Sequence, residues 1–562
     1  MDSAVDYSSN SRIISVGNTL IAGSLGISAE GLELEYSDCL FKTVNGSIFI
    51  LCGNAYAMCG AVMEYLNAEF GVEVYASDCY FVETKGSDHV LSEINKTVEY
   101  DMDIRTTDSQ FLTDYDTDHL MGFVGRDTTI FSVSASAHQT LTYYVPYATY
   151  KTSHPKWYNN YSSRAESATQ VCYNANGDET ELKLMKQAFL DKMIWGLNRY
   201  PSSYIFIIGN EDNDDFCTCV TCTAKKDTYG TNNASALHFC NDLADMLNEW
   251  MNGNGSAYKR DFEILFLAYQ GDIGAPSVYN SVSGKYEPID DTVVCKENVS
   301  VFFAPLHMDF KSSIYADVNK TPREAFEGWK ACSDEISLYL YQTNYQDTLV
   351  FFDSISCMQE LYQFFATGNI KFVHSSGNGY NAITPGWEVL TAYLQSVLAK
   401  DVNADLEKAK NAFFNNYFGV AAEPMRKYFD SYMEWTKYLR DNHVYDEVAI
   451  PVYELLIRKP AYWSTEEFSI WLGYVNEALA AIKGLKETDL EAYEILYDRI
   501  ILERIPIYYI ANEMISSFGA SLHGVTANDC RRVVKEDCER LGITSRGRLG
   551  DLATLYALWG LL

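Results

Sequence analysis

Hydrophobic residues recur through the middle of the chain in short runs that alternate with longer amphipathic stretches. The short runs are rich in β-branched and aromatic side chains and are bounded by polar or turn-forming residues, which predicts strands. The eight predicted strands are 102–105, 129–133, 169–173, 204–208, 262–267, 299–303, 336–340 and 370–373. Helical spacing of apolar residues between some of these runs predicts helices over 182–197, 234–250 and 348–365.

This alternation of strands and helices predicts an α/β fold built on a (β/α)8 TIM barrel, an architecture that typically takes about 250 residues. The alternative is a doubly wound open sheet. That fold would be expected to carry a Gly-rich phosphate-binding turn after its first strand, and the chain has no such turn. The barrel is therefore the preferred interpretation.

The segments on either side of the predicted barrel differ from it. Before it, strands at 13–16, 32–36, 47–51 and 72–75 and a helix at 57–70 predict a small α/β domain. After it the pattern is helical, and Ser464 with Glu467 forms a capping-box pattern at one predicted helix start. We expect three domains, at residues 1–100, 101–400 and 401–562.

Composition narrows the possible partners. The formal net charge is −33, which disfavours nucleic acid and anionic membranes, because both attract basic surfaces. No apolar run approaches 18 residues, so we expect no insertion into a membrane. The residues from Met1 to Ala4 begin no basic-plus-apolar secretion signal. The 14 cysteines are scattered and do not fix the compartment.

Catalytic groups of a (β/α)8 barrel follow the C-terminal ends of its strands. Here those positions carry amides, aromatic rings and acids, which suit the hydroxyl groups and ring faces of sugars. The candidate substrate-binding residues are Arg105, His138, Tyr269, Gln270, His307, Tyr341, Asn344, Tyr345 and Trp387. Motifs of serine hydrolases, P-loop proteins and zinc proteases are absent from the sequence.

The two acids Glu211 and Asp212 follow the fourth predicted strand and are the candidate catalytic residues. Glycoside hydrolysis needs one carboxyl as proton donor and a second group to stabilise or attack the cationic centre. Neighbours in a strand face opposite ways, so both can serve one site only where the strand end is irregular. The alternative is that Asp212, Asp214 and Asp215 form a solvated acidic turn or a cation site.

Three cysteines, Cys217, Cys219 and Cys222, follow directly and have the spacing of part of a structural zinc site. A fourth ligand is usual. Cys172, at the end of the third predicted strand, is one candidate, and His238 and Cys240 are others. A disulfide, or reduced thiols that pack a loop, would explain the same pattern.

Four segments resemble bacterial proteins that carry the domain of unknown function 4838: 209–222, 268–270, 340–345 and 416–421. Some of these proteins belong to glycoside hydrolase family 163, whose members are endo-β-N-acetylglucosaminidases acting on complex N-glycans. Residues 154–158 are similar to the group's His-Pro-Glu-Tyr-Phe pattern, from which Lys156 departs. The resemblance spans about residues 30 to 430. The N-terminal region resembles the small domain that precedes the barrel in α-glucuronidases and β-hexosaminidases.

The resemblance implies a retaining, substrate-assisted hydrolase of glycans or glycoproteins that is secreted or on the cell surface and needs no catalytic cofactor. By analogy with hexosaminidases that have adjacent carboxylates, Asp212 is expected to be the acid and Glu211 the group that orients the substrate acetamide. The reverse assignment stays open. Two alternatives also remain: another exo-glycosidase, of the hexosaminidase or uronic-acid type, and a non-catalytic glycan-binding protein.

Overall fold

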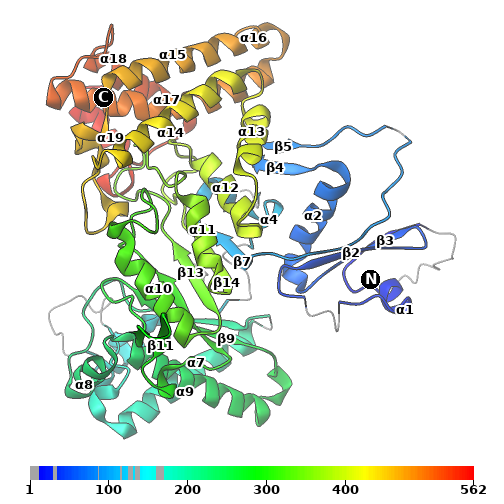
Figure 1. The fold of residues 1–562 in the computed structure, drawn as a ribbon, viewed down its shortest axis with the longest axis vertical. Helices are drawn as coiled ribbons and strands as arrows, with labels where there is room; N and C mark the ends of the chain where they lie inside the picture. The colour runs from blue at the N-terminus through cyan, green and yellow to red at the C-terminus, as the bar shows by residue number, and fades with distance from the viewer. Residues whose placement is uncertain are drawn as a thin grey trace.

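The computed structural model describes residues 12–29, 34–86, 88–113, 117–124, 131–132, 139–159, 170–200 and 202–561. At its centre lies a parallel sheet of six strands in the order β7-β14-β13-β12-β9-β8. The strands are β7 (Met102–Thr107), β8 (Ile205–Ile208), β9 (Glu263–Tyr269), β12 (Val299–Ala304), β13 (Ile336–Leu340) and β14 (Ile370–Ser375). Figure 1 shows this sheet between the N-terminal region on one side and the C-terminal helices at one end. The described residues thus form a mixed α/β protein.

Each of these six strands lies where the hydrophobic pattern predicts one. Every residue of β7, β12 and β13 is buried, as expected for parallel strands covered on both faces. On the outer face Phe303 packs against Phe326 and Phe365 of the covering helices. On the inner face Phe302 packs against Phe372, with ring centroids 5.3 Å apart.

The other two predicted strands have different outcomes. Of the run 129–133, the structure describes only Phe131 and Ser132, and Phe131 makes an isolated parallel bridge to Ile205 at the outer edge of β8. The prediction of a barrel strand at 169–173 is wrong, because Val171 pairs with Tyr158 in an antiparallel bridge. Apolar spacing in so short a run cannot tell which neighbour buries it.

Helices cover the outer face of the sheet. They are α7 (Glu179–Arg199), α9 (Asn233–Asn252), α10 (Lys320–Cys332), α11 (Met358–Ala366) and α12 (Glu388–Lys400), while α8 (Val220–Tyr229) packs against α9. The predictions over 182–197 and 234–250 are confirmed. The third predicted helix begins late, at Met358, because the Asp347 and Asp353 carboxylates accept from the N–H groups of Leu349 and Ser356 and so favour turns. A hairpin of β10 (Ser277–Asn280) and β11 (Lys285–Pro288) was not predicted.

The N-terminal region contains a sheet in the order β1-β3-β2-β6 and one long helix. Their bounds are β1 (Ile14–Val16), β2 (Cys39–Val44), β3 (Ser47–Cys52), β6 (Asn95–Val98) and α2 (Met58–Phe70). The predicted strand at 32–36 is not formed over residues 34–36, and residues 32 and 33 lie outside the described part of the chain.

A separate hairpin joins this region to the C-terminal helices. It consists of β4 (Glu73–Ala76) and β5 (Cys79–Phe81), which pair with each other and not with the N-terminal sheet. Figure 1 shows the hairpin beside α13 (Leu406–Tyr417). The side chain of Asn416 donates to the hydroxyl of Tyr75 at 3.0 Å, and the ring of Tyr75 packs against Phe413. The strand predicted at 72–75 therefore serves as a contact between regions.

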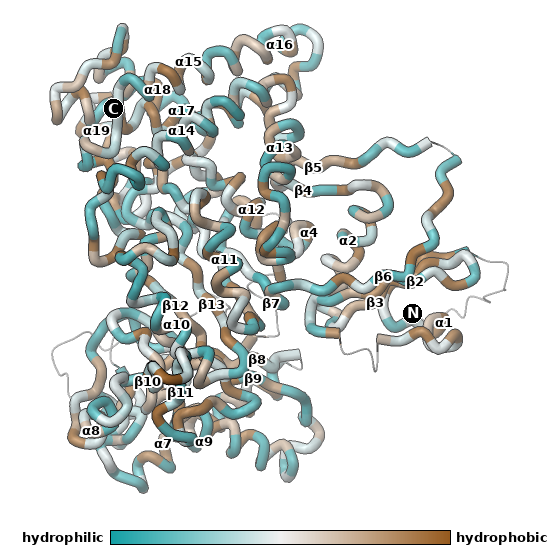
Figure 2. Tube along the Cα trace, viewed as in Figure 1, coloured by the Kyte–Doolittle hydropathy of each residue, from teal (hydrophilic) through white to brown (hydrophobic). Residues whose placement is uncertain are grey.

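The rest of the chain is helical, as predicted. The main elements are α14 (Ala422–Asp441), α15 (Thr465–Ile482), α17 (Leu490–Phe518), α18 (Ala527–Leu541) and α19 (Leu552–Leu558). Ser464 caps α15, because its side chain accepts from the N–H of Glu467 at 3.3 Å. Hydrophobic and hydrophilic residues alternate along these helices in Figure 2. Within the described residues, no helix combines the length and the apolar character that a membrane span requires.

Candidate active site

Glu211 and Asp212 follow the end of β8, where the strand gives way to a tight turn. Ile207 of β8 pairs with Leu265 of β9, so both side chains point to the inner face of the sheet. After the strand ends at Ile208, the N–H of Asn213 donates to the carbonyl of Glu211 at 2.7 Å, which closes a three-residue turn centred on Asp212. Glu211 is 1% exposed, whereas Asp212 is exposed to solvent. The two neighbours thus occupy different environments.

A buried glutamine holds this turn from the adjacent segment. The side-chain amide of Gln170 donates to the carbonyls of Glu211 and Asn213, at 2.9 Å in each case. Its oxygen accepts from the N–H of Glu211 at 3.1 Å. The three bonds satisfy backbone groups beyond the end of β8, so one buried side chain helps to hold the turn in place.

The Glu211 carboxyl lies in an environment that favours its neutral form. Burial, with a smaller contribution from the charge of Asp212, raises the pKa of Glu211 to about 7. The N–H of Thr142 donates to this carboxyl at 3.3 Å and acts in the opposite direction. Near neutral pH, therefore, a substantial fraction of Glu211 carries a proton.

The Asp212 carboxylate is held by two donors from the end of β9. The hydroxyl of Tyr269 donates to Asp212 at 2.8 Å, and the side-chain amide of Gln270 donates to the same oxygen at 2.5 Å. Burial raises the pKa of Tyr269, so its hydroxyl remains a donor. Gln270 has a φ of 60°, a left-handed conformation that non-glycine residues rarely adopt. Strain of this kind is typical of functional sites.

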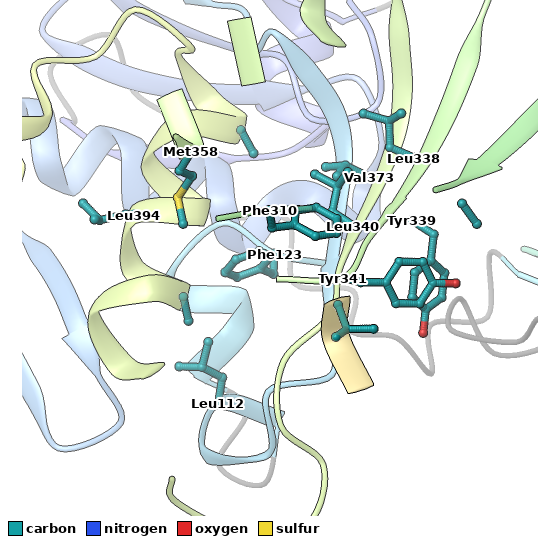
Figure 3. Close-up of a cluster of buried hydrophobic side chains, with 14 of the residues drawn as sticks. Leu112, Phe123, Phe310, Leu338, Tyr339, Leu340, Tyr341, Met358, Val373 and Leu394 are labelled. Atoms are coloured by element: carbon teal, nitrogen blue, oxygen red, sulfur yellow. The ribbon is translucent and has the colours of Figure 1, made fainter. Parts of the chain in front are cut away.

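A row of tyrosines lines the inner face beside Asp212. Tyr269 stacks with Tyr341 at a centroid distance of 6.5 Å, and Tyr341 stacks with Tyr339 at 4.6 Å. Figure 3 shows the rings of Tyr339 and Tyr341 together on one side of the strands. Tyr345 continues the row, 6.4 Å from Tyr341 and 5.8 Å from Tyr453. Such rings offer apolar faces to sugars and hydroxyls to their polar groups.

Four residues that contact the acid pair or the tyrosine row were not predicted from the sequence: Tyr453, Arg548, Gln170 and Thr142. Tyr453 comes from the C-terminal region, and Arg548 of the same region lies 3.9 Å above its ring and donates to its hydroxyl at 2.9 Å. The backbone N–H of Arg548 also donates to the carbonyl of Tyr345 at 3.1 Å. Neither residue stands in a motif or near the predicted barrel in sequence. The roles of Gln170 and Thr142 are likewise visible only in three dimensions.

A second polar group lies at the C-terminal ends of β7 and β14. Nε2 of the buried His374 is 3.7 Å from the Asp108 carboxylate, and its ring lies 4.6 Å from that of Tyr339. Tyr345 shares a hydrogen bond with the hydroxyl of Ser376, which lies 3.5 Å from Asp108. His374 and Ser376 therefore contact Tyr339 and Tyr345 of the tyrosine row.

Two of the predicted substrate-binding residues are instead engaged with the backbone. The Arg105 guanidinium donates to the carbonyls of Met102, Asp103 and Gly122, so its donors face the surrounding chain. Asn344 donates to the carbonyl of Glu454, and its oxygen accepts from the N–H groups of two residues that follow it. Buried amide and guanidinium groups need such partners, which sequence position alone does not reveal.

Two more predicted residues lie apart from the acid pair. Trp387 is 1% exposed and packs against α14, with its ring 5.0 Å from Tyr428 and 5.2 Å from Phe429. His307 is bonded through Nδ1 to the carbonyl of Ala449 at 2.6 Å. His138 lies outside the described residues. Of the predicted set, Tyr269, Gln270, Tyr341 and Tyr345 are brought together with Asp212.

The predicted cysteine cluster gains a fourth member from the neighbouring segment. The thiol sulfurs of Cys172, Cys217, Cys219 and Cys222 all lie within 4.8 Å of one another. The other two candidates are elsewhere: His238 is bonded to Lys225 and Thr292, and Cys240 is buried within α9.

Comparison with solved structures finds low overall similarity to several carbohydrate-active proteins. A family 115 4-O-methyl-α-glucuronidase is 9% identical, with 95% of this chain and 72% of that one covered and a TM-score of 0.48. A family 89 glycoside hydrolase from Clostridium perfringens is 10% identical, with coverages of 90% and 61% and a TM-score of 0.41. A β-N-acetylhexosaminidase from Bacteroides fragilis is 9% identical, with coverages of 69% and 80% and a TM-score of 0.33.

No curated protein matches the chain. The model of one family, the domain of unknown function DUF4838, matches residues 74–253 and 286–430, which is more than half of the sequence. Those segments contain the acid pair, the four cysteines and most of the tyrosine row. The chain belongs to the DUF4838 family.

Proposed function

We propose that this protein is a glycoside hydrolase, an endo-β-N-acetylglucosaminidase that cleaves N-glycans by a retaining, substrate-assisted mechanism. The observation that carries the proposal is the pairing of a buried carboxyl, Glu211, with an exposed carboxylate, Asp212, beside a row of tyrosines. We further propose that the six parallel strands belong to a TIM-type barrel, which the bridge from Phe131 to Ile205 extends beyond the outer edge of β8.

In this mechanism Glu211 is the general acid and Asp212 orients the substrate. The acetamide oxygen of the sugar attacks C1, the bond from C1 to the glycosidic oxygen breaks, and Glu211 gives its proton to the leaving oxygen. Asp212 accepts a hydrogen bond from the acetamide N–H and balances its growing positive charge. The attack of the acetamide oxygen on C1 has closed an oxazoline ring. Water then attacks C1, Glu211 takes a proton from the water, and the bond from C1 to the oxazoline oxygen breaks.

These roles reverse the assignment expected by analogy with hexosaminidases. Two carboxyls in different environments are assigned by their tendency to hold a proton. Burial raises the pKa of Glu211 to about 7, whereas Asp212 is exposed and accepts hydrogen bonds from Tyr269 and Gln270. Because Glu211 is 1% exposed, the role also requires that substrate binding open a path to its carboxyl.

Substitution of each acid tests the two roles separately. We expect Glu211→Gln and Asp212→Asn each to lower kcat on a natural glycan by about 10²–10⁴-fold, the usual contribution of a positioned acid or base. An aryl glycoside with a good leaving group should restore much of the activity of Glu211→Gln but not that of Asp212→Asn. Thermal unfolding should be unchanged within a few degrees in Asp212→Asn, because that side chain is exposed.

Glu249→Gln, an exposed acid on α9, is the matched control and should keep full activity. Wild-type rates in both site variants would reject the mechanism. Binding of the glycan without turnover by the wild-type protein would instead support the non-catalytic alternative.

One observation favours a second candidate, a glycosidase that acts on acidic sugars. Such a site needs a cation, and Arg548 supplies one, exposed and stacked on Tyr453 at the end of the tyrosine row. If this candidate is right, Arg548→Ala should raise KM for a uronic-acid glycoside at least tenfold. For an N-acetylglucosamine glycoside the same variant should change KM little.

The proposed substrate also bears on location. N-glycans occur on proteins that have entered the secretory route, so an enzyme that acts on them would meet its substrate outside the cell that makes the enzyme. We therefore propose that the protein is secreted or held at the cell surface, with glycans or glycoproteins as its partners.

A further inference from the structure

We propose that Cys172, Cys217, Cys219 and Cys222 bind one zinc ion, and that this ion fixes the segment that carries Glu211 and Asp212. The cysteines come from two parts of the chain that run beside each other, and three of the four side chains are buried. Metal binding by these cysteines is independent of the proposed function, and only the effect of the metal on activity rests on that function.

The spacing of the sulfurs matches a tetrahedral metal site. The Sγ atom of Cys172 lies 3.6 Å from that of Cys222 and 3.8 Å from that of Cys219. Four sulfurs about 2.3 Å from a central zinc ion stand roughly 3.8 Å apart along each edge of the tetrahedron. A disulfide would bring two sulfurs to about 2.05 Å, well short of these separations. The arrangement leaves room for an ion at the centre of four thiolates.

Backbone and side-chain N–H groups point at the sulfurs, as expected of a site for thiolates. Cys219 caps α8, and its sulfur accepts from the N–H of Cys222 at 3.4 Å. The N–H of Asn176 donates to the Cys172 sulfur at 3.1 Å, and the side chain of Asn174 donates to the Cys222 sulfur at 3.2 Å. Such donors stabilise negative sulfur and orient the ligands of a metal.

The chemistry of the ligand set indicates zinc and a structural role. Four thiolates in tetrahedral arrangement select zinc or iron among common metals, and a closed set of four leaves no position for water or substrate. Zinc brings no redox chemistry, so such a site acts by holding chain segments together. Here it would join the segment around Cys172 to the start of α8.

The position of this cross-link relates it to the acid pair. Cys172 is two residues after Gln170, whose amide holds the backbone of Glu211 and Asn213. Cys217 is five residues after Asp212. One metal ion therefore ties down both segments that meet at the turn, and its loss should loosen the turn even though the metal touches no substrate.

Metal analysis of the full-length protein tests the site directly. Protein produced with added zinc and purified without chelator should contain about one zinc ion per chain, as measured by inductively coupled plasma mass spectrometry. Cys172→Ser and Cys222→Ser should each lower that content at least fivefold. Cys240→Ser, at a buried cysteine outside the cluster, is the matched control and should keep it.

Cobalt provides a second test that does not depend on how well the variants fold. Wild-type protein loaded with Co²⁺ should show an intense near-ultraviolet thiolate-to-metal absorption and the visible bands of tetrahedral cobalt. Zinc content below a tenth of an equivalent, bound iron in place of zinc, or a mass that shows a disulfide among these cysteines would each overturn the proposal. Activity is measured separately, so a metal-bound protein with no glycosidase activity would reject the proposed function and keep the site.

Discussion

At the scale of single residues, Glu211 and Asp212 differ in what surrounds them rather than in chemistry. Glu211 is buried and has one weak donor, the N–H of Thr142, whereas Asp212 is exposed and accepts from Tyr269 and Gln270. The sequence predicts the pair and the need for an irregular strand end. It cannot predict which of the two holds the proton, because that depends on burial and on donors 57 and 58 residues away.

The raised pKa of Glu211 predicts the shape of the pH profile. A general acid works in its protonated form, so kcat/KM should fall as pH rises through about 7, the pKa of the Glu211 carboxyl. In Glu211→Gln, assayed on an aryl glycoside with a good leaving group, this fall should disappear, while Asp212→Asn should retain it. A profile that falls above pH 7 equally in both variants would assign the proton to another group.

At the scale of elements, the hydrophobic pattern located the six parallel strands because each is a short apolar run buried on both faces. It could not distinguish the antiparallel bridge at Val171 from a barrel strand, nor find the hairpin of β4 and β5 as a contact with α13. Those features depend on partners far away in the chain. The fourth cysteine was predicted as one of three candidates, and only the fold selects Cys172.

Gln170 connects the segment that contains Val171 and Cys172 to the turn that carries Glu211 and Asp212. In Gln170→Ala the carbonyls of Glu211 and Asn213 and the N–H of Glu211 each lose their hydrogen bond to Gln170, while the Glu211 carbonyl keeps its bond from the N–H of Asn213; a buried polar group left unsatisfied costs about 1–3 kcal/mol. We expect a lower midpoint of denaturant unfolding and, in the folded protein, a kcat at least tenfold lower.

A matched variant separates general destabilisation from loss of the turn. Asn241→Ala removes a buried amide that bonds to the backbone at Val294 and Lys296 but lies in α9, away from the acid pair. It should lower stability by a similar amount and leave kcat unchanged. Equal losses of kcat in the two variants would mean that Gln170 has no specific role in placing the turn.

At the scale of the whole molecule, the candidate site draws on distant parts of the chain. Strand ends supply Asp212, Tyr269 and Tyr341, and the C-terminal region supplies Tyr453 and Arg548. The sequence predicted only that this region is helical, because helical periodicity indicates which face of a helix is buried and not which loop reaches the site. The contribution of the C-terminal helices could therefore be recognised only from the folded chain.

The charge of the whole molecule predicts how stability depends on pH. Burial raises the pKa of Glu211 and Glu388 to about 7 and that of Glu263 and Glu503 to about 8. The folded state therefore holds protons that the unfolded chain, with carboxyls near 4.5, has released. This stabilisation is complete at acidic pH and is lost as pH rises toward 8. Repulsion between the negative charges of a chain of net charge −33 also lowers the stability of the folded state as pH rises.

Denaturant unfolding at pH 5 and pH 8 should show the higher midpoint at pH 5. Glu503→Gln keeps an acceptor for the N–H groups of Gly386 and Trp387 but cannot ionise, so it should reduce the difference. Stability that increases from pH 5 to pH 8 would show that these carboxyls are ionised in the folded protein without penalty.

Catalysis of N-glycan cleavage by Glu211 and Asp212 is tested by the mass of a glycopeptide after incubation with the protein. We predict that the wild-type protein leaves a single N-acetylhexosamine on the asparagine and that neither Glu211→Gln nor Asp212→Asn does so in the same time. An unchanged glycopeptide mass with the wild-type protein across several complex N-glycans, or the same product from both variants at the wild-type rate, would contradict the account.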